Sequence, residues 1–393
     1  MSQICLYLEL HQPLRLAPLS VTALGSQVTS YFHLATHDDN QVIFSKVAKK
    51  SYYPMLALLK KLLVTEPEFC FALSLSGVFL EQARAYEPKI LALVRGLVET
   101  GRVELLAETY HHSLASLYSA TEFAEQVALH TQTLQQLFGV IPTVFRNTEL
   151  IYSNAIAEQV VALGFAGMLT EAVPRYLGER SPTRVYQSAT QSHLPLLLKQ
   201  AQLSDDIAFR FSDRNWQWYP LSVEQYLDWI AQFGSTDSIN LFMDFETFGE
   251  HQWADTGIFE FFQSFVTDAI QKYQHRFVTP STALWGDSSG MYDVPEPISW
   301  ADVDRDLTAW TGNALQQDTL RLLYSLEKRV RATKDKQLLN DWRLLQTSDH
   351  FYYMCTKWSA DGDVHAYFSP YESPFEAYRQ YAVTLAHLRE HLE

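Results

Sequence analysis

Short apolar segments and longer amphipathic segments alternate regularly along residues 4–273, which restricts the chain to few folds. The apolar segments are rich in β-branched and aromatic residues and predict strands at residues 4–10, 69–74, 103–106, 142–146, 164–169 and 239–243. The other segments have helical spacing and are residues 42–63, 88–98, 121–138, 154–163, 223–233 and 258–273. Strands that alternate with helices pair in parallel, so the pattern predicts either a barrel or a doubly wound sheet.

Two parts of the chain depart from this alternation. Residues 170–220 carry only weak strand signals, and beyond Pro280 the helical periodicity continues with few strand candidates. The predicted C-terminal helices are residues 302–317, 319–332, 336–358 and 374–392. Residues 285–297 are rich in Gly, Ser, Asp and Pro, as linkers are. We therefore predict an α/β domain over residues 1–285 and a helical domain over residues 286–393.

The composition excludes several classes of partner. The chain has 30 basic and 45 acidic residues, and a net charge of −15 disfavours binding to nucleic acid or anionic membranes. The three cysteines are widely spaced, without a CxxC pair, which predicts neither a disulfide framework nor a zinc ribbon. The N-terminus lacks the basic residues of a secretory signal, and the longest apolar stretch is well short of the roughly 20 residues that span a bilayer. We expect a cytoplasmic protein that binds no membrane.

Residues 243–252, MDFETFGEHQ, place several ionisable groups at the end of a predicted strand. Asp244 and Glu246 are separated by one residue, and Glu250 and His251 follow closely. Burying these groups without partners is costly, so the segment is expected to face a cleft. The aromatic residues among them argue against a merely solvated acidic loop.

Polar residues also follow four other predicted strands. They are HQP at residues 11–13, GVFLEQ at 77–82, ETYHH at 108–112 and RNTE at 146–149. Parallel α/β folds place their chemistry at the carboxyl ends of the strands, so these segments are expected to share one rim. Several carboxyls and histidines on one rim are typical of a glycosidase cleft, where one carboxylate and one proton donor serve an oxocarbenium-like transition state. Spacing alone does not select the pair.

Five blocks of the sequence closely resemble the conserved regions of glycoside hydrolase family 57, in its α-amylase-like members. The blocks are HQP at residue 11, GVFLEQ at 77, FRNTEL at 145, MDFETFGEH at 243 and SWADVDRDLTAWTGN at 299. The resemblance extends to TSDHFYYM at residue 347 and so covers nearly the whole chain. It implies an α/β fold with an incomplete TIM-like (β/α)7 barrel over residues 1–285, followed by a helical domain that packs on the barrel and completes the cleft.

The resemblance also implies a retaining glycoside hydrolase that acts on α-1,4-glucans or maltooligosaccharides through a covalent glycosyl-enzyme intermediate. Glu149 has the position of the nucleophile and Asp244 that of the general acid/base. Because the acid must be protonated near neutral pH, we expect the pKa of Asp244 to be raised, with Glu246 raising it by like-charge repulsion. Arg146 is expected to favour the ionised Glu149 if its side chain turns the same way.

Further residues are predicted to bind the substrate or support the site. They are His11, Gln12, Glu81, His112, Arg146, Glu246, His251, Trp253, Trp300, Trp310, Asp349 and His350. We expect His11 to hydrogen-bond a sugar hydroxyl and His112, rather than its neighbour, to face the barrel mouth. A purely structural role stays open for two of these residues. Glu81 is then a carboxylate near a helix N-terminus, and Trp253 is a packing residue.

Three other functions stay open at this point. A 4-α-glucanotransferase or another transglycosylase passes through the same intermediate, because a sugar can attack it in place of water. A non-catalytic glucan-binding homologue would keep the fold without turnover. A metal-dependent carbohydrate deacetylase would need Asp and His ligands, but no HExxH motif is present and no Asp-Asp pair closes the first strand, so we predict neither a metal nor another cofactor.

Overall fold

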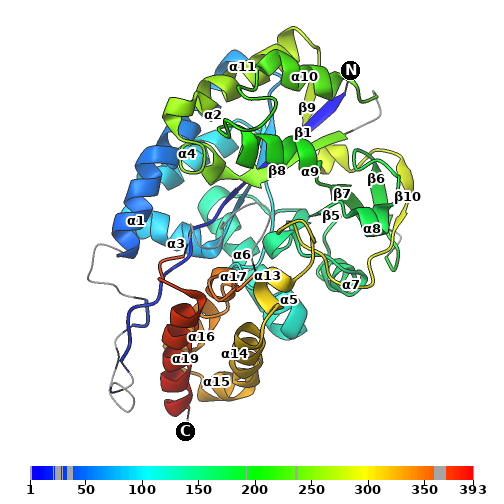
Figure 1. Cartoon of the computed structure of the whole chain (residues 1–393). Helices are drawn as coiled ribbons and strands as arrows, with labels where there is room; N and C mark the ends of the chain where they lie inside the picture. Colours follow the sequence, from blue (N-terminus) through cyan, green and yellow to red (C-terminus); the bar gives the residue numbers. More distant parts are fainter. Residues whose placement is uncertain are drawn as a thin grey trace.

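Parallel strands curl into an incomplete barrel in the computed structural model (Figure 1), which describes residues 2–20, 22, 28, 30–32, 39–191, 193–234, 238–357 and 369–392. The barrel strands are β1 (Gln3–Leu10), β2 (Phe71–Leu75), β3 (Val103–Leu105), β4 (Val144–Arg146), β5 (Gly167–Thr170), β7 (Pro195–Leu198) and β8 (Ser238–Asp244). Strands β8, β1, β2 and β3 are parallel neighbours in one sheet, and β4, β5 and β7 are parallel neighbours in another.

The two sheets are joined on both sides. The backbone N–H of Ala107, just after β3, donates to Val144 of β4 at 3.0 Å. On the opposite side, the N–H of Gln200, just after β7, donates to the carbonyl of Asn240 in β8 at 2.8 Å. The carboxyl ends of the strands therefore meet at one rim, and the predicted fold class, an incomplete TIM-like barrel followed by helices, is confirmed.

Four strands were not predicted, and one of them is the barrel strand β7. In the weakly patterned region, β6 (Val185–Ser188) pairs antiparallel with β7. The segment predicted to be linker-like contains β10 (Ser288–Tyr292), which pairs in parallel with β6. The short β9 (Arg276–Val278) pairs with the first residues of β1. These strands are short, and β10 is Gly- and Ser-rich, so tertiary pairing rather than local propensity forms them.

Helices cover the outside of the barrel. They are α1 (Asn40–Val47), η2 (Ala48–Tyr52), α2 (Tyr53–Thr65), α3 (Gly77–Tyr86), α4 (Lys89–Val98), α5 (Ala115–Tyr118), α6 (Ala120–Phe138), η3 (Thr148–Leu150), α7 (Asn154–Ala162), α8 (Pro174–Leu177), α9 (Ala201–Asp205), η4 (Asp206–Arg210), α10 (Val223–Ala231), η5 (Phe245–Thr247), η6 (Ala254–Thr256), α11 (Ile258–Gln271) and α12 (Pro280–Ala283). The single helix predicted over residues 42–63 is interrupted by the π-helical turn η2. Helix α6 is capped by Ser119 rather than the predicted Thr121, whereas its predicted C-cap, Gly139, is confirmed.

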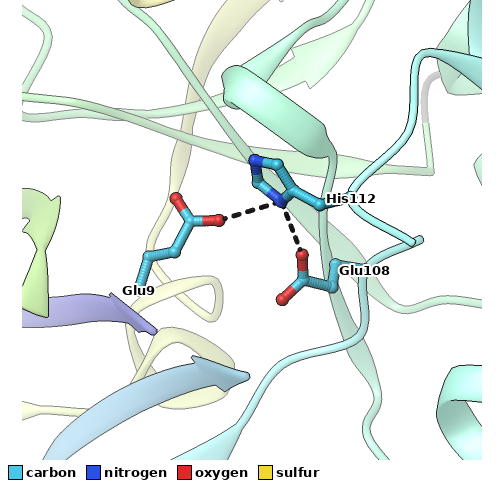
Figure 2. A group of neighbouring side chains, drawn as sticks. All are labelled: Glu9, Glu108 and His112. Carbon is cyan, nitrogen blue, oxygen red and sulfur yellow. Dashed lines mark hydrogen bonds and ion pairs between the residues drawn. The ribbon is translucent and has the colours of Figure 1, made fainter. Parts of the chain in front are cut away.

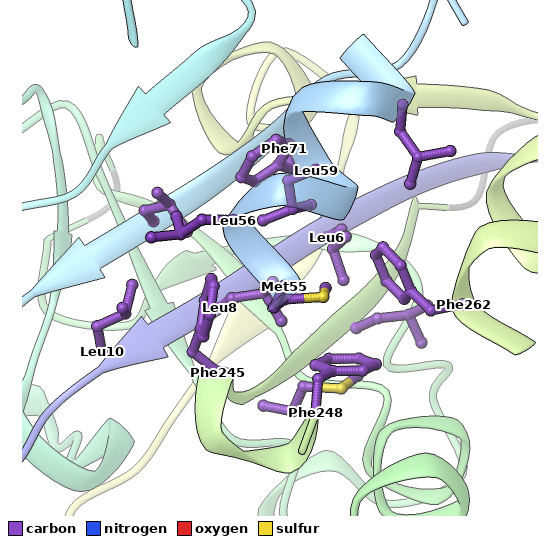
Figure 3. Packing of buried hydrophobic residues seen from close by; sticks show 14 of the residues in the cluster. Leu6, Leu8, Leu10, Met55, Leu56, Leu59, Phe71, Phe245, Phe248 and Phe262 are labelled. Carbon is purple, nitrogen blue, oxygen red and sulfur yellow. The ribbon is translucent and has the colours of Figure 1, made fainter. Parts of the chain in front are cut away.

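The core beneath α2 and α11 explains how β1 orients its polar residues. The packed side chains of Figure 3 are Leu6, Leu8, Leu10, Met55, Leu56, Leu59, Phe71, Phe245, Phe248 and Phe262. Side chains alternate along a strand, so leucines at even positions of β1 that point to these helices turn Glu9 to the opposite face. That face is the barrel interior, and Glu9 is buried in it.

The C-terminal part is helical, as predicted. Its helices are α13 (Thr308–Thr311), α14 (Ala314–Ser325), α15 (Glu327–Thr333), α16 (Lys336–Leu344), α17 (Ser348–Tyr352) and α19 (Pro374–Glu390). The predicted helix over residues 336–358 divides into α16 and α17, and its last residue lies outside the described part of the chain. Within the described residues no helix is both long and apolar enough to cross a bilayer.

One hydrophobic cluster is shared by the barrel and these helices. It contains Phe145 and Met168 from the barrel strands together with Leu320 and Trp342 from the C-terminal helices. Ion pairs add to the contact, because the buried Glu122 of α6 binds Arg343 of α16 at 2.8 Å. The domain boundary between residues 285 and 286 stays a prediction. Strand β10, which follows this boundary in the sequence, pairs with β6 and so belongs to the sheet.

Candidate active site

The carboxyl ends of the barrel strands bring together charged residues that lie far apart in the sequence. Glu9 of β1 is the register partner of Asp244, the last residue of β8. Arg146 ends β4, and Glu149 lies in the 3-10 turn η3 that follows. The predicted pair, Glu149 and Asp244, therefore lies on the same rim, near enough for the Glu149 charge to act on Asp244.

Glu149 is held by three donors and carries a charge. Its backbone is left-handed (φ 58°, ψ 24°), which is uncommon for a non-glycine residue and typical of functional sites. Its Oε1 accepts from Ser348 Oγ at 2.9 Å and its Oε2 from Trp300 Nε1 at 2.8 Å. The third donor, His112 Nε2, lies 3.4 Å from Oε1. Burial raises the pKa of Glu149, but the hydrogen bond and charge of His112 outweigh it and lower the pKa below its ordinary value.

The pKa of Asp244 is shifted in the opposite direction, upward. Burial and then the charge of Glu149 raise its pKa to about 6, although Arg146 and Lys199 act in the other direction. One carboxyl of the pair therefore stays ionised while the other keeps its proton up to about pH 6, above the ordinary range of an aspartate, which is the division of roles that a nucleophile and a general acid need.

The expected role of Glu246 needs correction. Its side chain is buried and accepts a hydrogen bond from Tyr52 Oη at 2.6 Å. Burial raises the pKa of Glu246 well above its ordinary value, so this carboxyl is protonated and exerts little repulsion on Asp244. The charge that raises the pKa of Asp244 comes from Glu149.

Arg146 turns into the barrel interior. Its guanidinium is fully buried, forms an ion pair with Glu9 and lies 3.9 Å from Glu108. It also lowers the pKa of Glu149, as expected, but less than His112 does. Its main partner is thus Glu9, a residue that the sequence interpretation had not included in the site.

His11 and His112 lie face to face at the centre of the site. Their ring centroids are 3.9 Å apart and their planes 19° apart. His11 is held by Ser76 Oγ at 2.7 Å and by Asp349 Oδ2 at 3.0 Å. Of the two adjacent histidines after β3, His112 is the one that faces Glu149, in agreement with the choice made from the sequence, whereas His111 packs beside Tyr110.

Trp300 reaches the site from the segment after β10. Besides the indole hydrogen bond, its backbone N–H donates to the carbonyl of Glu149 at 3.2 Å. The cations of Arg146 and Lys199 lie 5.2 and 5.3 Å from its ring centroid. This indole therefore connects Glu149 to the two buried cations of the barrel.

The remaining predicted residues lie apart from this carboxylate pair or have other partners. Gln12 accepts from Gln82 through its backbone carbonyl, and Glu81 accepts from Tyr110 Oη at 2.7 Å. Trp310 and His350 are buried in packing positions. His251 is partly exposed in the loop after β8. Trp253 is 54 % exposed, with Lys50 Nζ 5.3 Å from its ring centroid, so its predicted substrate contact stays open.

Several residues of the site were missed. They are Glu9, Glu108, Glu171, Lys199, Asp205, Arg305 and Ser348. Glu9 carried a detectable signal, because it is a charged residue inside an otherwise apolar strand. The buried Lys199 follows β7, a strand whose signal was too weak to indicate that a rim residue comes next.

Glu9, Glu108 and His112 are close enough together to coordinate a metal ion (Figure 2). Their lone pairs already have partners, however. Arg146 pairs with Glu9, Ser74 Oγ donates to Glu108, and His112 Nδ1 points at both carboxylates. A cation placed there would lie against the buried guanidinium, so the group fits an internal ion-pair network better than a metal centre.

A barrel rim with two carboxyls whose pKa values are shifted in opposite directions, and with hydrogen-bond donors on the one whose pKa is lowered, is typical of a glycosidase site. The comparison with protein families agrees. The model of glycosyl hydrolase family 57 matches residues 5–289, and the chain belongs to this family. The chain is therefore a glycoside hydrolase. A protein of Methanocaldococcus jannaschii named "Putative alpha-amylase" is 40% identical over 386 residues, which cover 95% of this chain and 81% of that protein.

Solved structures share the fold at low sequence identity. The 4-α-glucanotransferase of Thermococcus litoralis superposes with a TM-score of 0.67 at 14% identity, over 89% of this chain. This chain spans only 56% of that enzyme. An α-amylase of Thermotoga maritima superposes with a TM-score of 0.65 at 12% identity, over 100% of this chain and 93% of that one.

Proposed function

We propose that the protein hydrolyses α-1,4-glucans or maltooligosaccharides with retention of configuration, with Glu149 as nucleophile and Asp244 as general acid/base. The observation that supports this most is the opposite shift of the two pKa values, downward for Glu149 and to about 6 for Asp244. The α-glucan substrate is proposed from the relative in M. jannaschii and from the amylase-like sequence blocks.

In the first half-reaction a Glu149 oxygen attacks the anomeric carbon while the glycosidic C–O bond breaks, and Asp244 gives its proton to the leaving oxygen. In the second, Asp244 takes a proton from water, the water oxygen attacks the anomeric carbon, and the bond to Glu149 breaks with its electron pair returning to the carboxylate. The His112, Trp300 and Ser348 donors stabilise that carboxylate when it is released.

The test is the incubation of the wild type with maltooligosaccharides, amylose and glycogen beside Glu149→Gln and Asp244→Asn variants. We expect reducing ends from the wild type, with a loss of about 10²- to 10⁴-fold in Asp244→Asn. NMR of the first product should show the α-anomer, because retention of an α-linkage gives an α-product. Absence of turnover on every α-glucan, or an initial β-anomer, would contradict the proposal.

Transfer to a sugar acceptor is the second candidate, and the fold similarity to a 4-α-glucanotransferase is the observation that favours it. Chromatography of the products separates the two outcomes. Hydrolysis shortens a pure maltooligosaccharide and increases reducing ends, whereas transfer gives longer and shorter chains at constant reducing ends. Activity that persists in EDTA would exclude the deacetylase-like metal mechanism, and a wild type that binds glucans without any product would indicate a non-catalytic homologue.

A further inference from the structure

Both ring nitrogens of His112 face carboxylates, and Figure 2 shows the two, Glu9 and Glu108, that lie at Nδ1. Its Nδ1 lies 3.1 Å from Glu108 Oε2 and 3.3 Å from Glu9 Oε1, and its Nε2 lies 3.4 Å from Glu149 Oε1. An ionised carboxylate only accepts hydrogen bonds, whereas a neutral imidazole carries one proton. Both nitrogens face acceptors, so the arrangement is satisfied by the doubly protonated imidazolium.

The position of the ring is fixed independently of its charge. The residue is left-handed (φ 49°), its N–H donates to the Thr109 carbonyl at 3.0 Å, and its own carbonyl accepts from Ser348 N–H at 2.9 Å. The stacked His11 ring covers one face, and burial together with the charge of His112 lowers the pKa of His11. His11 is therefore neutral, and His112 is the cation of this pair.

The charged groups around His112 differ in how firmly they hold their charge. Burial raises the pKa of Glu108, but the contacts with His112, His130 and Arg146 outweigh it and bring the pKa to about 2. Burial raises the pKa of Glu9 to about 8 in spite of its ion pair with Arg146. Glu108 is thus the anion that persists at every working pH.

Further groups face this cluster from the other elements packed against it. Asp349 of α17 is hydrogen-bonded to His11 at 3.0 Å, and the charge of His112 lowers the pKa values of both Asp349 and Asp244. Burial lowers the pKa of His112, but the surrounding carboxylates, Glu9 first, raise it well above its ordinary value.

We propose that Glu108, assisted by Glu9, is a positioning residue of the reaction that holds His112 as an imidazolium whose Nε2–H points at the nucleophile Glu149. The inference rests on the proposed function and adds the source of the charge beside the nucleophile. In the first half-reaction the imidazolium keeps Glu149 ionised and oriented. In the second it stabilises Glu149 as the leaving group, and it keeps both of its own protons throughout.

A substrate that needs no acid catalyst isolates this effect. With an aryl α-maltoside whose phenol is a good leaving group, kcat/KM does not need the proton of Asp244, so in the wild type kcat/KM should stay constant well above the ordinary histidine pKa of about 6.5. In Glu108→Gln the amide keeps the shape but not the charge, and His112 should lose its proton about 1–3 pH units earlier. The profile of kcat/KM against pH should therefore gain a basic limb, that is, a fall at high pH, because the deprotonated Nε2 then faces the Glu149 carboxylate.

Three variants make the assignment specific. Glu9→Gln should move the limb less than Glu108→Gln does, because a pKa of about 8 leaves Glu9 largely protonated below that pH. The titration of His112 in the wild type serves if Glu108→Gln does not fold. The double variant Glu108→Gln/His112→Gln should lose the limb, because its amide cannot titrate. Glu104→Gln, on the same strand segment but bound to Ser281, should keep the wild-type profile. A basic limb in Glu108→Gln that coincides with that of the wild type would overturn the proposal.

NMR of histidine-labelled protein tests the charge without turnover. The His112 signal is assigned by its loss in His112→Gln. We expect His112 to stay doubly protonated well above its ordinary pKa of about 6.5 in the wild type and to titrate about 1–3 units lower in Glu108→Gln. Titration of wild-type His112 near its ordinary value of about 6.5 would overturn the inference. Failure of the proposed function would look different, since the wild type would turn over no α-glucoside while the His112 titration stayed high.

Discussion

At the scale of single residues, burial and charge separate the roles of two carboxyls that are chemically similar. Asp244 lacks the donors that surround Glu149, and burial raises its pKa to about 6. Glu149 has Ser348, Trp300 and His112 on its oxygens, and its pKa is lowered. The same cleft therefore holds an acid and an anion because the neighbours of each differ.

The first prediction concerns the pH dependence of the reaction. Asp244 must be protonated to act as the acid, and a raised pKa of about 6 means that the proton is present below pH 6 and lost above it. With maltooligosaccharides, kcat/KM should fall about tenfold per pH unit above pH 6. Steady-state kinetics from pH 4 to 9 measure this. A fall that begins near pH 4 would contradict the assignment, and an aryl maltoside should lack the fall because its leaving group needs no proton.

A second prediction concerns Trp300. Trp300→Phe keeps an aromatic ring but removes the Nε1–H that donates to Glu149. A hydrogen bond to a charged group contributes about 1.5–3 kcal/mol, so kcat/KM should fall about 10- to 100-fold. Trp342→Phe is the matched control, because its buried indole donates to the Leu323 carbonyl in the helical core. The control should lose thermal stability and keep its kcat/KM, and equal losses of activity in both variants would refute the role.

At the scale of elements, the segment between β10 and α13 is anchored to the barrel by an ion network. Arg305 Nη2 binds Asp205 Oδ2 at 2.8 Å, and Lys199 Nζ binds the other oxygen of Asp205 at 2.8 Å. Glu171 completes the group at 3.5 Å from Arg305. Because Trp300 precedes Arg305 in the same segment, this network positions the indole that holds Glu149.

We predict that Asp205→Ala destabilises the fold and loosens this segment. Removing one member of a buried ion pair costs about 3–5 kcal/mol, because Lys199 and Arg305 lose their nearest carboxylate and keep only the more distant Glu171. Urea unfolding measures the loss, and kcat/KM should fall as the Trp300 contact weakens. Asp318→Ala breaks an exposed pair with Arg321 and should leave both quantities unchanged. An Asp205→Ala variant as stable as the wild type would show that the network does not anchor the segment.

At the scale of the whole molecule, the barrel and the C-terminal helices share one hydrophobic cluster and form one site. The cluster runs from Phe145 and Met168 to Leu320 and Trp342. The proposed nucleophile Glu149 lies in the barrel, while its donors Trp300 and Ser348 come from the part of the chain after β10. Stability and catalysis therefore both depend on the contact between the two parts.

Cooperative unfolding is the fourth prediction. Leu320→Ala removes a fully buried side chain from the C-terminal helices and should cost about 2–5 kcal/mol. Because the core is shared, circular dichroism and tryptophan fluorescence should report one coincident transition that moves as a whole. Val64→Ala, at a residue that is 76 % exposed, is the control and should leave the midpoint in place. Two separate transitions, with only one moved, would instead support independent domains.

The sequence by itself determined a parallel α/β architecture, because alternating periods of about 2 and 3.6 residues are local properties of the chain. The choice of a barrel over a doubly wound sheet came from the family resemblance. Polar residues after β1, β3, β4 and β8 indicated the rim, and the family resemblance selected Glu149 and Asp244. Strands β6, β7, β9 and β10 escaped prediction because they are short and carry weak strand signals. In addition, β9 and β10 pair with strands that lie far away in the sequence.

Only the tertiary structure decided which charged group shifts the pKa of which site residue. It replaced Glu246 by Glu149 as the charge that raises the pKa of Asp244, and it turned Arg146 toward Glu9. It also placed Glu108 beside His112 Nδ1, the ring nitrogen that does not face Glu149. Electrostatic effects depend on distance and burial, which a linear sequence does not contain, so the residues of a reactive pair can be recognised before their protonation states can.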